Sequence, residues 1–306
     1  MMNGGHASFS ALTGTMLVSA LDAFQLAPVT PQTYLWCAVL LSAGAGLIND
    51  IDSDGAAFST SVPMVTRPLG ELLQWCSRTS YRVSARECDR SPYANRRDYD
   101  GLTPFWKALV TLGIVTVADE GDTDKVGEHR GLTHWWGFAV IVGVLLAWLI
   151  AAYPIAALFV TGICLPSGIR ALTWVVVDLA KTVGITRLRG IDRWTAMALS
   201  VVITLIFAEN IIAFGPWIGV VVALGMLNHD CGDSITKYGI PWKAFIPHRC
   251  DRHRAQHPQP ARKCAMWDRN TILPAWMTFT TGSPVELVIS AASLAGTGGL
   301  VSVALL

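Results

Sequence analysis

Long apolar runs separated by polar stretches dominate the pattern of this chain. A membrane-spanning helix needs about 17 to 25 apolar residues, and seven runs reach that length, near residues 7–24, 33–49, 134–152, 155–178, 195–213, 215–231 and 284–305. The run at 108–118 is too short to cross, so we expect it to form a buried strand or to lie at the membrane interface. The pattern predicts an all-α fold, a polytopic transmembrane bundle of about seven helices.

Composition supports a membrane protein and argues against an ordinary soluble one. Hydrophobic residues make up 52% of the chain, charged residues only 15%, and the mean hydropathy is +0.43. The formal net charge of +1 gives no reason to expect a nucleic-acid partner. An odd number of scattered cysteines predicts no disulfide framework in a reducing cytoplasm; they are Cys37, Cys76, Cys88, Cys164, Cys231, Cys250 and Cys264.

The positive charges fall on one set of loops, which predicts the orientation. The loops at 25–32, 151–153 and 214–216 contain no Lys or Arg. The alternate loops carry them, at 67–130, 181–193 and 237–269. Because short cytoplasmic loops collect Lys and Arg, the N-terminus and these basic loops are expected in the cytoplasm.

We expect one membrane-embedded domain over residues 1–306, interrupted by a cytoplasmic insert at 53–128 and a basic cytoplasmic loop at 248–283. Arg170 falls inside an expected span beside Pro166 and Gly168, which predicts a break or re-entrant turn there. The basic loop contains His248, Cys250, His253, His257 and Cys264. A second, structural zinc site is one interpretation, but neighbouring arginines would repel a cation, so a solvated lipid-facing loop is favoured.

Histidines and acids gather where the expected helices end on the cytoplasmic side. The positions are His6, Asp50, Asp52, His129, His134, His229 and Asp233. His229 and Asp233 are spaced i and i+4, on one helical face. An ionisable group at membrane depth costs roughly 2.5 to 3.5 kcal/mol, so such a cluster indicates function. Imidazole and carboxylate are ordinary ligands of zinc, and also of manganese or iron, so we expect one shared metal site.

Each residue also has a purely structural interpretation. His6 alone could cap the first helix, and His229 with Asp233 could form a hydrogen-bonded core pair. Asp50 and Asp52 could be solvated acids at a helix end, although the helix dipole disfavours a carboxylate there.

Four segments resemble the motif blocks of the YdjM family of bacterial inner-membrane metal-dependent hydrolases. They are "GGHASFSALTG", "GLINDIDSDGAAFST", "HRGLTHWW" and "LGMLNHDCGDSITKYGIPWKAFIP", in the family's order. The resemblance implies a multi-pass protein of the inner membrane. It also implies that the seven histidines and aspartates above are metal ligands or catalytic groups, with Arg130, Thr133 and Thr236 beside them.

Three positions depart from the family pattern. Asn49 stands where the family usually has proline, Ser53 where a histidine commonly follows the second acid, and Trp135 where serine is usual. If that missing histidine were a ligand, Asp54 or water would have to replace it.

The expected mechanism is hydrolysis by a metal, zinc being favoured. A metal with an open position lowers the pKa of bound water towards about 7. The expected catalytic groups are Asp52 as a carboxylate base and His134 for proton transfer. Arg130, or an arginine of residues 249–254, is expected to neutralise an anionic substrate. At a membrane surface the expected partner and substrate is a lipid or another small amphiphile, with phosphoester cleavage favoured over acyl-ester or amide cleavage.

Other classes fit less well. Di-iron desaturases require adjacent histidine pairs, and none of the seven histidines is adjacent to another. The His-Glu-x-x-His motif of metalloproteases is absent from the sequence. A transporter or scaffold with a metal site is the non-enzymatic alternative, although transport sites lie near the membrane midplane.

His129 and His134 constrain the local backbone. On an ideal helix, the side chains of two residues five positions apart would point about 140° from one another. They can share a site only if the segment between them is a turn, bent at Gly131, with Thr133 capping a helix that begins at His134. Arg130 would then project towards the substrate.

Overall fold

The computed structural model describes residues 3–53, 56–84, 131–236, 240–241, 272 and 283–305. Within these ranges the chain is helical, with only isolated bridge residues at Thr236 and Ile240 and no β-strand. The all-α expectation is therefore confirmed for the described part of the chain. Residues 108–118 and the histidine and cysteine cluster of the basic loop lie outside the described residues.

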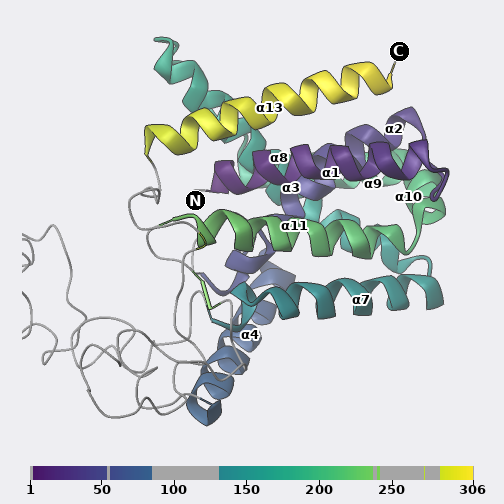
Figure 1. Ribbon diagram of the computed structural model, residues 1–306, viewed down its shortest axis with the longest axis vertical. Coiled ribbons are helices and arrows are strands. Elements are labelled where there is room, and N and C mark those ends of the chain that lie inside the picture. The colour runs from purple at the N-terminus through teal and green to yellow at the C-terminus, as the bar shows by residue number, and fades with distance from the viewer. Residues whose placement is uncertain are drawn as a thin grey trace, which may run out of the picture.

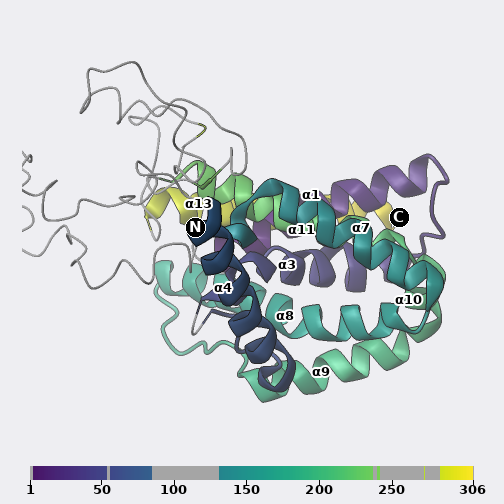
Figure 2. The same ribbon diagram turned by 90° about the horizontal axis from the view of Figure 1, so that it is seen from below.

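Six helices lie roughly side by side along one direction (Figures 1 and 2). They are α1 (Asn3–Ala23), α7 (Trp136–Ala152), α8 (Ala156–Thr182), α9 (Arg193–Ile206), α11 (Trp217–Ser234) and α13 (Pro284–Ala304). The short α10 (Ala208–Phe214) follows α9. Each apolar run of spanning length in the sequence is thus helical, with ends close to those expected.

The second apolar run is helical but irregular. It consists of α2 (Pro31–Thr33), the π-helix η1 (Tyr34–Leu41) and α3 (Ser42–Ala45). It ends in the 3₁₀ helix η2 (Ile48–Asp52), which carries the first acidic motif. A π-helical segment often accompanies a functional site, and this one leads directly to Asp50 and Asp52.

The expected count of seven spans is wrong. Two described helices, α8 and α13, are long and apolar enough to cross a membrane, and a third span results if α9 and α10, bent by 74°, act together. Two of the other runs, at α7 and α11, do not qualify as membrane spans, for different reasons. At 1.5 Å per residue, the 17 residues of α7 reach about 25 Å, short of a hydrocarbon core of about 30 Å. Helix α11 ends in polar residues, including His229 and Asp233.

The break expected near Arg170 is also wrong. Helix α8 continues through Pro166 from Ala156 to Thr182. Arg170 instead finds partners outside its helix, since Nη1 donates hydrogen bonds to the Ala57 carbonyl at 3.3 Å and to Thr60 Oγ1 at 3.1 Å. Backbone and hydroxyl acceptors satisfy Nη1 without unwinding the helix, while Nε has no hydrogen-bond partner among the described residues.

Small residues let the central helices approach closely. A Cβ on Gly168 of α8 would overlap the backbone of Leu40 and Gly44, and a Cβ on Gly219 of α11 would overlap the backbone of Gly143 in α7. Close backbone contact through small residues is typical of helix packing in membranes.

The outer faces of the bundle expose large apolar side chains. Val144 and Trp148 of α7 are 62% and 67% exposed, and Leu205 and Ile206 of α9 are 69% and 68% exposed. Apolar faces of this extent suit a lipid environment, which agrees with the hydropathy of the chain.

Helix α4 (Pro63–Ser84) crosses the direction of the bundle at an angle, near the start of α7 (Figures 1 and 2). Its inner face supports the acidic and histidine motifs, because Gln74 Nε2 donates to the Asp52 carbonyl at 2.6 Å and Ser77 Oγ accepts from the Leu132 amide at 3.0 Å. Helix α4 thus forms hydrogen bonds both with η2 and with the segment that precedes α7.

Candidate metal centre

Four segments meet at one end of the bundle. His6 lies in the first turns of α1, Asp50 in η2, His134 in the 3₁₀ helix η4 (Leu132–His134), and His229 with Asp233 in the last turns of α11. Figure 1 shows why they meet, because α1 and α7 begin at the end where α11 finishes. The predicted convergence of helix ends is therefore found for these five residues.

His6, His229 and Asp233 form the first group of possible metal ligands, with one ligand atom from each within 4.8 Å of the others. His6 Nε2 lies 3.2 Å from Asp233 Oδ1, and His229 Nε2 lies 3.8 Å from Asp233 Oδ2. The imidazole rings of His6 and His229 stack, with centroids 3.7 Å apart. The i and i+4 spacing of His229 and Asp233 does place both side chains on one face of α11.

Asp50, His134 and His229 form the second group, so His229 belongs to both. Asp50 Oδ1 lies 3.4 Å from His229 Nε2 and 3.6 Å from His134 Nε2. The two Nε2 atoms are 3.2 Å apart, and His134 Nε2 is 3.6 Å from Asp233 Oδ2. The two groups are therefore one continuous cluster.

Hydrogen bonds on the far side of two rings determine which nitrogen faces the cluster. His229 Nδ1 lies 2.8 Å from the Gly46 carbonyl, which can only accept, so Nδ1 carries the proton. Thr133 Oγ1 donates to Asp52 Oδ2 at 2.6 Å and lies 3.1 Å from His134 Nδ1. Because its one proton goes to Asp52, Thr133 accepts from Nδ1–H of His134.

This arrangement fits a divalent metal. If both rings are neutral, Nε2 of His134 and of His229 present lone pairs to the carboxylates of Asp50 and Asp233. Lone pairs and carboxylate oxygens at 3.2–3.8 Å from one another repel unless a cation or added protons lie between them. An imidazole that donates from its other nitrogen to a carbonyl or carboxylate system is also the usual arrangement for a metal-ligating histidine.

The electrostatics favour the carboxylate form of Asp50. Burial alone would raise the pKa of its carboxyl, but the charges and hydrogen bonds of His229 and His134 lower the pKa well below its ordinary value. Asp50 is also the most accessible of the five, with 14% of its side chain exposed against 2% or less for the others. Water or a substrate would reach the cluster from the side of Asp50.

Glycines allow the helices around the cluster to touch. A Cβ on Gly225 of α11 would overlap Ala45 and Gly46, and a Cβ on Gly46 would overlap Ser10 of α1. This close approach brings the Gly46 carbonyl within reach of His229, so glycine at these two positions helps to orient the imidazole.

Asp52 and Thr236 lie beside the cluster. Asp52 is buried and accepts from Thr133, but it belongs to neither group of clustered ligand atoms. Thr236 Oγ1 donates to the Asp233 carbonyl at 2.7 Å, just after the end of α11. His129, Arg130 and Asp54 lie outside the described residues, so their expected roles remain predictions.

The turn expected before α7 is present, but its capping residue was predicted wrongly. Gly131 precedes η4, and α7 begins at Trp136 with Trp135 at its N-cap position. Thr133 does not cap α7, because its hydroxyl is used by Asp52 and His134. His134 accordingly lies in the turn and not in the helix.

Sequence reasoning missed a buried polar pair. Asn49 Nδ2 donates to Asp230 Oδ1 at 2.7 Å and to the Met226 carbonyl at 3.1 Å, and both side chains are buried. Asp230 is spaced i and i+3 from Asp233, so it lies beside the face of α11 that bears the candidate ligands. An acid directly beside a buried histidine was the signal that could have identified it.

Comparison with known proteins gives one match. A family model described as YdjM inner membrane protein matches residues 1–195. No curated protein and no solved structure matches the chain. The matched region contains His6, Asp50 and His134, whereas His229 and Asp233 lie beyond it.

Proposed function

The chain belongs to the YdjM inner membrane protein family, and from this membership and the buried cluster we propose that it is a membrane-bound metal-dependent hydrolase. The observation that carries the proposal is the arrangement of His134 and His229. Each has its Nδ1 proton engaged away from the cluster and its Nε2 directed at two carboxylates.

His6, Asp50, His134, His229 and Asp233 would hold the metal, with zinc favoured and manganese or iron as the other suitable ions. When bound, such an ion supplies Lewis-acid polarisation and makes water more acidic.

The residues around the cluster have separate tasks. Thr133 and Asp52 keep the proton of His134 on Nδ1, so that Nε2 stays available. Asp50 lies at the exposed edge and, besides holding the metal, would accept a proton from an attacking water in place of Asp52, which is buried and accepts from Thr133. Arg130 remains our proposal for the group that neutralises an anionic substrate.

The surroundings support an amphiphilic substrate at the membrane surface. The outer face of α4 exposes Met64, Val65, Leu69, Leu72 and Trp75, by 43% to 91%. A helix that is apolar on its outer side, and that crosses the bundle at the end bearing the cluster, suits the lipid interface. We therefore propose a lipid or other amphiphile as the substrate, with phosphoester cleavage favoured.

We propose further that this end of the bundle faces the cytoplasm in a multi-pass protein of the inner membrane, as the distribution of Lys and Arg indicates. The position of the cluster at helix ends favours hydrolysis at the surface over transport, whose sites lie near the midplane.

Elemental analysis joined to an activity assay tests the proposal. Detergent-purified protein should contain near-stoichiometric zinc, manganese or iron and should hydrolyse a phosphoester lipid such as phosphatidic acid. Removing the metal with a chelator should abolish turnover, and restoring it should recover turnover. Full activity in a preparation without metal would refute the proposal.

A further inference from the structure

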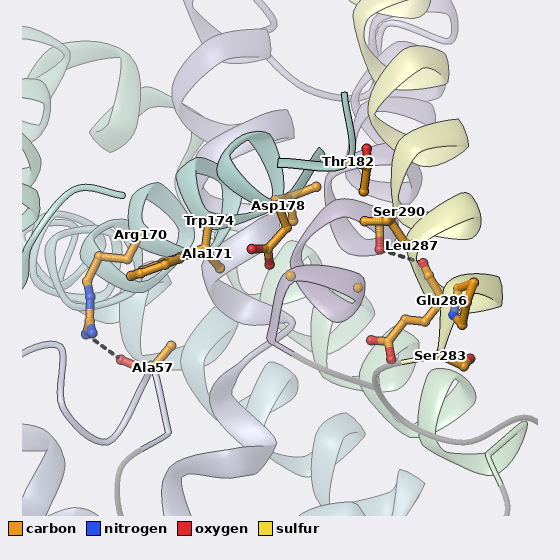
Figure 3. A pocket seen from close by; sticks show the side chains of 14 residues that line it. Ala57, Arg170, Ala171, Trp174, Asp178, Thr182, Ser283, Glu286, Leu287 and Ser290 are labelled. Carbon is orange, nitrogen blue, oxygen red and sulfur yellow. Dashed lines mark hydrogen bonds between the residues drawn. The ribbon is translucent and has the colours of Figure 1, made fainter. Parts of the chain in front are cut away.

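A second feature of this end of the bundle is a cavity of about 720 Å³ between α1, α8 and α13 (Figure 3). Its size lies within the range of about 300 to 1,000 Å³ that is usual for small-molecule sites. One wall is the last half of α8, from Arg170 to Thr182, and the facing wall is the first turns of α13, from Ser283 to Ser290. Among the described residues, these walls belong to the two helices that are long and apolar enough to cross a membrane by themselves.

The inner surface of the cavity is mainly apolar, although it includes two buried polar atoms, Arg170 Nε and Ser283 Oγ, without a hydrogen-bond partner among the described residues. Ala171, Trp174, Val175 and Leu287 provide apolar surface. Arg170 donates to the Ala57 carbonyl, and Ser290 Oγ donates to the Glu286 carbonyl at 2.8 Å, as the dashed lines in Figure 3 show.

Of the three charged residues that line the cavity, Asp178 marks the end near water, whereas Arg170 is only partly exposed and Glu286 is buried. Asp178 lines the cavity and pairs with Lys181 at 3.1 Å, and these side chains are 40% and 48% exposed. The wall from Arg170 to Thr182 runs about 18 Å along α8. One leaflet of the hydrocarbon core is about 15 Å deep, half of about 30 Å. The cavity thus matches the reach of a single acyl chain whose headgroup remains at the surface.

The cavity and the candidate metal cluster share the first turn of α1. Gly4 and Gly5 line its third side and directly precede His6 in α1. Because glycines have no side chain, nothing of their own fills the space between α1 and the two walls. A chain bound here would keep the attached headgroup at the same end of the bundle as the cluster.

We propose that this cavity binds one acyl chain of the phospholipid on which the protein acts. The proposal rests on the proposed function and adds where the substrate is held. The requirement for an acyl chain would explain a preference for lipids over soluble phosphoesters that present the same headgroup.

A photoreactive phosphatidic acid with a diazirine in one acyl chain tests this proposal in purified protein reconstituted in nanodiscs. Cross-links should concentrate in peptides covering residues 170–182 and 284–290. Leu287→Trp should fill the cavity and reduce these cross-links at least fivefold. Val288→Trp is the matched control, since Val288 is the next residue of α13, is 67% exposed and does not line the cavity. It should leave the cross-links unchanged.

Two further readouts separate this proposal from the proposed function. Metal content should be normal in Leu287→Trp, and its turnover of a short-chain soluble phosphoester should be retained. Labelling that is equal in both tryptophan variants, or confined to α7 and α9, would overturn the acyl-chain site even if metal-dependent hydrolysis were found. Cross-linking that persists at the cavity in a protein without metal-dependent activity would leave a lipid site and remove its link to catalysis.

Discussion

The hydroxyl of Thr133 donates a 2.6 Å hydrogen bond to the carboxylate of Asp52, 81 residues earlier in the chain. The same hydroxyl lies 3.1 Å from His134 Nδ1, so one small side chain connects an acid of η2 to a candidate metal ligand. Groups that orient a ligating histidine in this way commonly change metal affinity when they are removed.

Thr133→Val should therefore weaken metal binding by about 10- to 100-fold, because the hydroxyl that fixes the His134 tautomer is lost while the shape is kept. Competition with a chromophoric chelator would measure the affinity. Thr133→Ser restores the hydroxyl and should bind metal nearly as the wild type does. Equal affinities for the valine and serine variants would show that the hydroxyl has no part in the site.

Asp233→Ala and His229→Ala should each lose most of the bound metal, because each removes a group shared by several contacts of the cluster. Elemental analysis of the purified variants gives the content directly. Asp178→Ala is the control, since Asp178 is an acid 40% exposed and paired with Lys181 outside the cluster. If both cluster variants kept full metal, His229 and Asp233 would be a structural pair.

Asn49→Ala should lower the free energy of unfolding by about 1 to 3 kcal/mol, because buried Asp230 would lose its hydrogen-bond donor. Denaturation in a fixed detergent, followed by circular dichroism, would measure the change. The double variant Asn49→Ala with Asp230→Ala should be less destabilised than the sum of the two single variants. Strict additivity would mean that the 2.7 Å contact contributes no coupling.

The outer face of α4 should lie in the lipid interface. A nitroxide at Leu72→Cys, on the apolar face, should be relaxed more by oxygen than by a water-soluble nickel complex. At Glu71→Cys, beside it on the same helix, the order should be reversed. Similar accessibility at the two positions would place this helix away from the membrane.

The orientation can be tested in intact cells carrying single-cysteine variants in a cysteine-free background. An impermeant thiol reagent should label Thr30→Cys and should leave Arg189→Cys unlabelled until the cells are opened. The reverse pattern would move the cluster and the basic loops to the outer face of the membrane.

Hydrophobic patterning identified the helical segments because burial in lipid or against other helices requires continuous apolar surface. It could not give the number of spans, since α7 is apolar but only 17 residues long and α11 ends in the polar residues of the site. In α11 the last turns are polar because they carry residues of the cluster.

The candidate ligands His6, Asp50, His134, His229 and Asp233 could be grouped from the sequence because they share one end of their helices. The contacts that support these ligands could not be predicted from the sequence. Thr133 fitted the pattern of an N-cap, and only the folded structure shows that Asp52 competes for its hydroxyl. The hydrogen bond to Asp230 comes from Asn49, which lies 181 residues earlier in the chain, and the sequence does not show that the two meet.

The residues of the cluster are also synthesised at different times. Its first residue is His6 and its last is Asp233, so the ribosome must add 227 residues after His6 to reach Asp233. At about 5 to 20 residues per second, this takes roughly 10 to 45 s. During that interval His6, which is buried in the folded protein, has no partner from α11. A nascent chain halted before residue 229 would therefore emerge with His6, Asp50 and His134 but without the two residues of α11 that link them.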